Sequence, residues 1–139
     1  MSMLIDLVNG VNSGASFTPG AQTTTANGSA VDLQNGTIDT AAVLNVGTVT
    51  GTTPTLAVQM QESPDNSTWT NVASGGLFTT VTASTARQVI RFLRQYRYVR
   101  AVATIAGTTP SFAMGVDVFC QKKYGASGTA SGVDRSPGT

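Results

Sequence analysis

The chain has 139 residues with eight basic and seven acidic side chains, so its net charge is +1, and only 11% of its residues are charged. This length fits one domain, and the nearly neutral charge provides no drive toward nucleic acid or an anionic membrane. The sequence has no histidine and a single cysteine, Cys120. These counts exclude histidine-based nucleophilic catalysis, most transition-metal sites and a disulfide framework.

The N-terminal part of the chain divides into a short apolar segment and a long polar one. Residues 1–8 predict a short strand and lack the basic start and long apolar stretch of a secretion signal. No run in the sequence is long and apolar enough to span a membrane. Residues 9–28 consist mainly of Gly, Ser, Thr, Asn and Ala, a composition that cannot bury enough apolar area to order itself. We therefore expect an N-terminal strand and extended arm over residues 1–28.

From residue 29 onward the pattern is one of short strands separated by turns. Leu56, Val58 and Met60 alternate with polar residues, which predicts a half-buried strand. We expect the only tryptophan, Trp69, to cap or fill the core between two sheets. The remaining strands are predicted over residues 29–33, 43–49, 68–72, 77–81, 88–92, 96–105 and 112–118.

A near-repeat marks two places in this series of strands. Thr48–Val58 returns as Thr104–Met114, and both copies contain the sequence Gly-Thr-Thr-Pro. Each copy predicts strand, four-residue loop and strand, so we expect two matching hairpins. Two widely separated copies do not indicate a solenoid or a propeller; they favour a two-sheet β-fold.

One stretch permits a second interpretation. Arg91, Arg94 and Arg97 are spaced by three residues, which would align them on one face of a helix. A short helix within residues 87–97 is therefore the alternative to the strand predicted there.

The C-terminal tail, residues 121–139, is nearly free of aliphatic side chains. Such a segment needs other surfaces to order it, and we expect neighbouring chains of an assembly to hold both this tail and the N-terminal arm. The sequence thus predicts an all-β, two-sheet antiparallel β-sandwich over residues 29–120, flanked by extended N- and C-terminal arms.

Chemical motifs are missing from the sequence. Most acidic residues stand in predicted turns or at strand ends, where they cap or solubilise, so a glycosidase-like carboxylate pair is not expected. Asp65-Asn66 lacks the dense oxygen-ligand spacing of a calcium loop, and no phosphate or dinucleotide loop is present. We interpret Cys120 as a small buried residue rather than a reactive thiol. We expect no enzymatic activity and no catalytic, cofactor or metal site.

All but one of the eight basic residues lie between residues 87 and 123, interleaved with aromatic residues. Such a mixture can bind single-stranded nucleic acid, protect a sheet edge by its charge, or form a protein interface, because Arg and Tyr are enriched at hot spots. The neutral net charge argues against nucleic acid, and we favour the protein interface. Its predicted residues are Arg87, Arg91, Arg94, Tyr96, Arg97, Tyr98, Arg100, Lys122, Lys123, Tyr124 and Arg135.

Three segments resemble a known family. The strand–turn–strand from Val58 to Trp69, the strand from Arg97 to Gly107 and the N-terminal Met3-Leu4-Ile5-Asp6 are similar to small head proteins of tailed bacteriophages, the capsid cement or decoration proteins. The resemblance covers roughly residues 29–120. It implies a jelly-roll-like sandwich, made in the host cytoplasm, that forms dimers or trimers on the outer capsid surface and bridges major capsid protein subunits.

Two other functions stay open at this stage. Outward Tyr96, Tyr98 and Trp69 would suit a carbohydrate- or receptor-binding module of a tail or fibre. A head–tail connector subunit, forming a ring of defined symmetry, is the weaker alternative. Neither alternative requires a membrane, a cofactor or direct contact with nucleic acid.

Overall fold

The computed structural model describes residues 10–122 and shows antiparallel β-structure. Its strands are β1 (Val11–Gln22), β2 (Ala26–Asn27), β3 (Val31–Asp32), β4 (Gly36–Ser63), β5 (Thr70–Asn71), β6 (Ala86–Leu93) and β7 (Tyr98–Lys122). They form one sheet with the order β1-β7-β4-β5, in which β2 and β3 also pair with β7, and β6 with β4. The all-β, antiparallel prediction is confirmed. The pairings join all strands in one sheet, so a two-sheet, jelly-roll-like sandwich is not confirmed.

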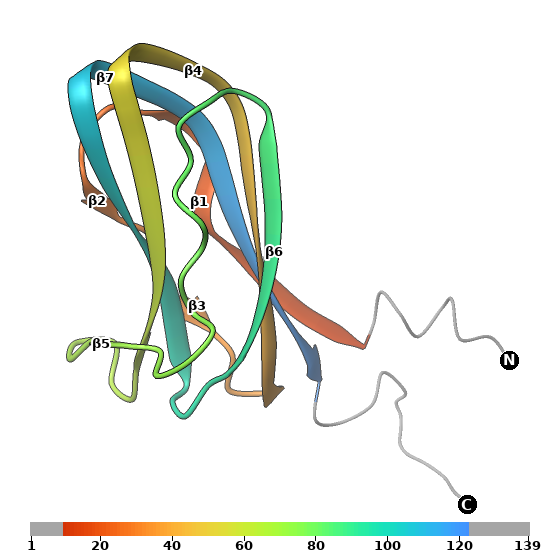
Figure 1. Cartoon of the computed structure of the whole chain (residues 1–139). Coiled ribbons are helices and arrows are strands. Elements are labelled where there is room, and N and C mark those ends of the chain that lie inside the picture. The colour runs from red at the N-terminus through yellow and green to blue at the C-terminus, as the bar shows by residue number, and fades with distance from the viewer. Residues whose placement is uncertain (1–9, 123–139) are drawn as a thin grey trace, which may run out of the picture.

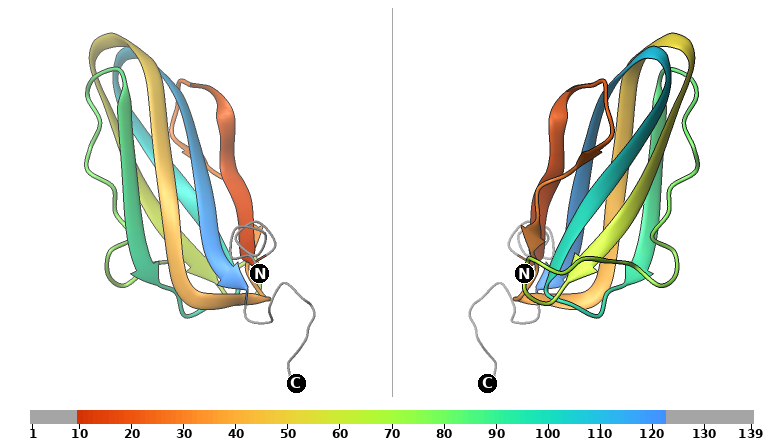
Figure 2. Two further views of the ribbon diagram at one scale, coloured as in Figure 1. Left: turned by 90° about the vertical axis from the view of Figure 1, so that its right-hand side faces the viewer. Right: turned by 90° about the vertical axis from the view of Figure 1, so that its left-hand side faces the viewer.

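Two very long strands carry the whole architecture. β4 and β7 pair from Gly36 opposite Lys122 to Ser63 opposite Tyr98. Figure 1 shows that both strands bend over together near their midpoints, so that this ribbon folds back on itself. The bend divides the sheet into two facing layers, and Figure 2 views the molecule from the side of each.

We call the two halves layer A and layer B. Layer A contains β1, β6, residues 36–50 of β4 and residues 111–122 of β7. Layer B contains β2, β3, β5, residues 55–63 of β4 and residues 98–106 of β7. Because both layers share β4 and β7, a single bent sheet covers both sides of the core.

The repeated Gly-Thr-Thr-Pro sequence forms the bend, and the prediction of two hairpin loops is wrong. Both copies lie inside strands, one in β4 and one in β7. The copies lie against each other, with Thr52 opposite Thr108 and register shifts on either side. Two sequence repeats that look independent are therefore the two sides of one corner.

Positive φ angles explain why the strands bend here. Gly51 and Gly107 have φ of 111° and 119°, and the threonines two positions later, Thr53 and Thr109, have φ of 48° and 47°. A Cβ on Gly51 would lie 2.8 Å from the Cα of Pro110, and one on Gly107 would lie 2.8 Å from the carbonyl oxygen of Thr53. The corner is thus locally two-fold symmetric, and glycine supplies both the backbone conformation and the close approach.

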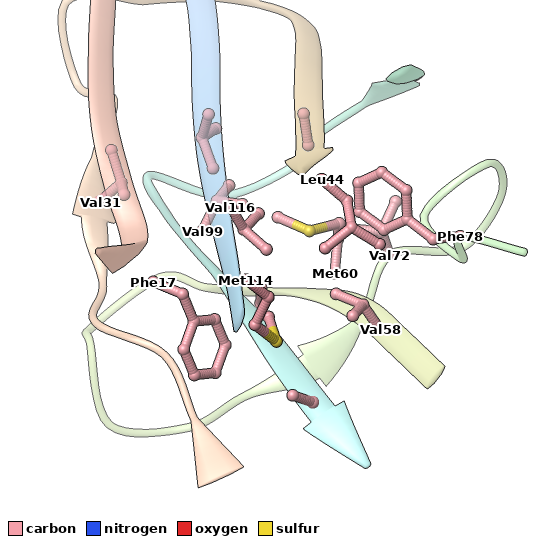
Figure 3. Packing of buried hydrophobic residues seen from close by; sticks show 14 of the residues in the cluster. Phe17, Val31, Leu44, Val58, Met60, Val72, Phe78, Val99, Met114 and Val116 are labelled. Atoms are coloured by element: carbon pink, nitrogen blue, oxygen red, sulfur yellow. The ribbon is translucent and has the colours of Figure 1, made fainter. Parts of the chain in front are cut away.

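The hydrophobic core lies between the two layers, as Figure 3 shows. Alternate residues of each long strand point into it, as expected for a strand with one buried face. The predicted alternation at Leu56, Val58 and Met60 is confirmed, since all three side chains are fully buried. Other members include Leu44, Phe78, Val99, Ala101, Ala103, Phe112, Met114, Val116 and Val118.

Residues 11–22, predicted to be part of an extended arm, instead form β1 along the edge of β7. The composition argument failed because it counted only side-chain area, whereas the backbone ladder with β7 holds this strand. Phe17 adds an apolar anchor, with 6% of its surface exposed. The hydroxyl of Ser16 donates to the carbonyl of Ser29 and accepts the N–H of Ala101, which ties β1 to layer B. The sheet therefore extends beyond the boundary predicted at residue 28.

The opposite side of the molecule is closed by residues 76–81. The predicted strand over 77–81 appears as two isolated bridges, Leu56 to Val81 and Gln59 to Leu77. The side-chain amide of Gln88 on β6 accepts the N–H of Thr79 at 2.8 Å and donates to its carbonyl at 2.8 Å. An amide side chain thus imitates a strand's backbone and connects layer B with β6.

Residues 87–97, Trp69 and the two termini are the subject of three further predictions. Residues 86–93 form strand β6, so the alternative of a helix within 87–97 is wrong. Trp69 is half-buried in the loop before β5 and does not belong to the core, so the prediction that it caps or fills the core is wrong. The strand predicted over residues 1–8 and the tail beyond residue 122 lie outside the described residues.

Candidate protein-binding faces

The predicted interface residues do not gather in one patch. Arg87 and Arg91 project from the outer face of layer A. Side chains alternate along β6, and Phe92, next to Arg91, points into the core. Arg100 lies on the outer face of layer B, next to the buried Val99 and Ala101. The two outer faces point in opposite directions. Lys122 ends β7 and is exposed, whereas Lys123, Tyr124 and Arg135 lie outside the described residues.

Arg94 is a structural residue and is removed from the candidate interface. Its side chain is buried, with 6% of the residue exposed. The guanidinium donates to the carbonyls of Leu33 at 2.8 Å, Gly36 at 2.7 Å, Thr37 at 3.1 Å and Tyr96 at 2.8 Å. Burial lowers the pKa of Arg94, but an arginine stays charged well above neutral pH. Arg94 therefore holds the β3–β4 turn against the β6–β7 turn.

A buried carboxylate supports the same β6–β7 turn. Glu62 is 3% exposed, and its carboxylate accepts the backbone N–H groups of Gln95 at 2.5 Å and Tyr96 at 3.1 Å. Together with Arg94, it satisfies polar backbone groups that the tight connection leaves without strand partners. This acidic residue consequently has a structural role in the β6–β7 turn.

The outer face of layer B carries a connected set of polar and aromatic side chains. The guanidinium of Arg100 lies over the ring of Trp69, 4.3 Å from its centroid. Arg100 also donates twice to the side-chain oxygen of Gln61, at 3.1 and 2.9 Å. Gln61 in turn donates to the side-chain oxygen of Asn71 at 3.1 Å. These contacts hold four side chains from three segments in a fixed arrangement.

The same face continues toward the β6–β7 turn. Arg97 lies over the ring of Tyr98, 4.9 Å from its centroid, and forms a two-point ion pair with Asp32 at 2.8 and 2.7 Å. The hydrogen bonds from Arg97 hold the pKa of Asp32 below its usual value. We call Trp69, Arg97, Tyr98 and Arg100 the aromatic–arginine face. Because tryptophan, tyrosine and arginine dominate interface hot spots, it is a candidate protein-binding face.

A second candidate face lies on layer A. Val89 and Leu93 stand on the outer face of β6 with 55% and 62% of their surfaces exposed. We call these two residues the β6 ridge. Arg91, between them on the same face, pairs with Asp39 of β4 at 2.5 Å. Hydrogen bonding to Arg91 lowers the pKa of Asp39, so this pair is fully charged at neutral pH.

A groove of about 430 Å³ lies beside the β6 ridge. Its lining comes from all four strands of layer A and includes Val11, Ala41, Arg91 and Phe119. Most of its accessible lining is apolar. Sequence reasoning missed this face, although the alternation of arginines with Val89 and Leu93 along β6 is a signal that could have revealed it.

The described residues offer little for chemistry. Among residues 10–122 no group of three or more His, Cys, Asp or Glu side chains comes together to hold a metal ion. The Oδ1 of Asp65 accepts the hydroxyl of Ser63 and the backbone N–H groups of Ser67 and Thr68, so this carboxylate builds its own turn. Burial raises the pKa of the Cys120 thiol, and the residue is 5% exposed. Both side chains have structural roles.

No helix in the part of the chain that the structure describes is long and apolar enough to cross a membrane.

Comparisons with known proteins bear on the fold. No family model and no curated protein matches the sequence. The chain is similar in structure to the SPBc2 prophage-derived protein YomS, with a TM-score of 0.50 and 12% identity over 81% of this chain and 95% of that chain. A match to FLHE covers 83% and 96% at 12% identity, and its TM-score of 0.35 carries no argument. The likeness to YomS shows that a chain of low sequence identity has a similar fold.

Proposed function

We propose that this chain is a structural protein of a tailed-phage particle, a cement protein that binds the outer surface of the head and bridges neighbouring major capsid subunits. The resemblance of residues 58–69 and 97–107 to phage cement proteins supports the proposal. The structural likeness to YomS, a prophage-derived protein, is in keeping with a phage origin.

The aromatic–arginine face is the observation that carries the binding role. Trp69 and Arg100 are held in place by each other and by Gln61, so little side-chain freedom is lost when a partner covers them. Tyr98 and Arg97 extend the same surface. A rigid cluster of these residue types supplies the centre of an interface, where single residues contribute about 2 kcal/mol or more.

Binding to a shell would amplify a modest single contact. A capsid presents many equivalent sites close together, so a protein that contacts two adjacent subunits gains avidity without any new type of contact. Binding of this kind needs only surface contacts, and the aromatic–arginine face would supply them on this chain.

The test uses major capsid protein from the same genome, assembled into heads that lack this chain. Purified protein is added, heads are sedimented, and bound copies are counted. We expect Trp69→Ala and Arg100→Ala to reduce affinity at least about tenfold, and Arg87→Ala, an exposed arginine on the opposite face, to bind like the wild type. Equal affinities for Arg100→Ala and Arg87→Ala would remove the aromatic–arginine face from the proposal, and no binding of the wild type would remove the cement role.

A carbohydrate- or receptor-binding role is the second candidate, and one observation favours it. The indole of Trp69 lies on the same face as the amides of Gln61 and Asn71, and sugars are bound by such combinations of a flat ring and amide groups. Glycan-array binding by the isolated protein that is lost in Trp69→Ala would support this role. Binding to heads but to no glycan would reject it.

A further inference from the structure

We propose that the outer face of layer A binds the same face of a second copy of this chain, forming a two-fold symmetric dimer that leaves the aromatic–arginine face free. The starting observation is the β6 ridge, whose two apolar side chains are more than half exposed. Such a ridge beside an apolar groove is unusual on a surface that stays in water. This proposal does not depend on the cement role, since it concerns the opposite face.

The register of layer A shows which residues of the other strands are level with each residue of β6. Arg91 is level with Ala41 and Phe119, and Val89 is level with Val43 and Asp117. Strand order across the layer is β6, β4, β7, β1. The ridge therefore occupies one margin of the face, and the groove crosses the face from Arg91 on β6 to Val11 on β1.

This arrangement is self-complementary. A two-fold axis parallel to the strands, between β4 and β7, brings β6 of each copy over β1 of the other, and β4 of each copy over the other's β7. Val89 of each copy then lies over Ala15 of its partner, and Leu93 lies toward the end of β1 that lines the groove at Val11. The same contact between β6 and β1 therefore forms twice, once on each side of the axis, in a single isologous interface.

The charges on the outer face of layer A are also compatible with the two-fold axis. Its exposed cations, Arg87 and Arg91, stand on β6, whereas the carboxylate of Asp117 stands on β7. Two strand spacings, about 10 Å, separate β6 from β7 within one copy. The two-fold axis brings each β6 over the other copy's β1, one strand spacing from its β7, so the arginine side of one copy meets the carboxylate side of the other.

The size of the face predicts a weak dimer. Four strands spaced by about 4.8 Å and eight residues rising about 3.4 Å each cover roughly 500 Å² per copy. A total of roughly 1,000 Å² is at the lower limit for a specific interface. We therefore expect dissociation in the micromolar range, so that the dimer is half-formed at micromolar concentrations.

Sedimentation equilibrium between about 1 and 300 μM tests the proposal on the full chain. We expect wild type to dimerise, Val89→Glu to remain monomeric with an unchanged circular dichroism spectrum, and Leu77→Glu to dimerise normally. Leu77 is the matched control, because it is 61% exposed and lies on the segment 76–81, outside layer A. Trp69→Ala should also dimerise normally, which separates this proposal from the binding role of the aromatic–arginine face.

A charge exchange provides a sharper test. Arg87→Asp and Asp117→Arg should each weaken the dimer at least about tenfold, and the double variant should recover most of the loss. A monomeric wild type at 300 μM, equal effects of Val89→Glu and Leu77→Glu, or no recovery in the double variant would each overturn the proposal. A monomer that dimerises after residues 1–9 are removed would assign the groove to the chain's own N-terminal segment instead.

Discussion

Replacing Arg94 by methionine keeps an unbranched apolar stem and removes the guanidinium. The wild-type group donates to four backbone carbonyls, and those of Leu33 and Gly36 are the most deeply buried of the four. Methionine replaces the stem of the side chain but offers no donor. The carbonyls then remain without partners unless the two turns separate and admit water.

The expected loss follows from counting the buried acceptors. A hydrogen bond from a charged donor contributes about 1.5–3 kcal/mol, so the bonds to Leu33 and Gly36 together contribute about 3–6 kcal/mol. The carbonyls of Thr37 and Tyr96 are nearer the surface and can regain water, and the methionine side chain recovers some apolar burial. We expect a net loss of about 3–5 kcal/mol in the free energy of unfolding.

Urea unfolding followed by circular dichroism measures this loss. With a dependence on urea of about 1.5 kcal/mol per molar, the midpoint should fall by about 2–3 M. Arg91→Met is the matched control, because the Arg91 side chain is 75% exposed, and its midpoint should remain close to that of the wild type. Arg94→Lys keeps the charge but cannot reproduce the planar fork, so it should fall between the two. A midpoint for Arg94→Met within about 0.5 M of the wild type would refute the structural role and return Arg94 to the candidate interface.

Other predictions concern the corner, the acidic side chains and the thiol. Gly51→Ala and Gly107→Ala should each destabilise the fold by about 2 kcal/mol or more in urea unfolding, because both need a positive φ and have backbone atoms 2.8 Å from the added Cβ; Gly47→Ala, whose nearest neighbour is 3.7 Å away, should cost less. Hydrogen bonds from the backbone N–H groups of Thr68 and Ser67 hold the pKa of Asp65 below the usual value of an aspartate. Its stabilisation is therefore present above about pH 4 and lost as the pH falls through the lower, folded pKa; the difference in urea midpoint between wild type and Asp65→Asn should close below pH 4, and a constant difference would contradict this. Cys120 should react with a thiol reagent only as the protein unfolds, since it is 5% exposed and its thiol pKa is raised; rapid modification without denaturant would show that the site opens locally.

Part of the fold was predictable because it depends on side chains that alternate along one strand. Leu56, Val58 and Met60 face the core as their pattern indicates, and so do Val99 and Ala101. β1 was not predictable in this way. Its stability comes from backbone pairing with a strand about a hundred residues away. Every residue type has similar backbone groups, so the amino-acid composition does not reveal this pairing.

The corner and the binding faces were hidden for a related reason. Gly-Thr-Thr-Pro is compatible with a hairpin loop or with a bent strand, and only the pairing of one copy with the other decides between them. Arginines at spacing three look alike in sequence, yet Arg91 is exposed and Arg94 is buried. Trp69 and Arg100 come into contact because β4 lies between β7, which carries Arg100, and β5, which Trp69 precedes. Each of these outcomes depends on a tertiary contact that no local window contains.

The long ribbon of β4 and β7 also determines when this protein can fold. Gly36 pairs with Lys122 and Val11 with Gln121, so nearly all of the chain must be synthesised before layer A can close. At about 5–20 residues per second, β1 and the first half of β4 wait for roughly 4–17 s before the end of β7 is available to pair with them. Chains dominated by such distant pairings fold in milliseconds to seconds. Strand edges left open for that time can pair with other chains, so crowded synthesis of many copies would favour aggregation, and a nascent chain that stops before Phe112 would lack the partner that layer A requires.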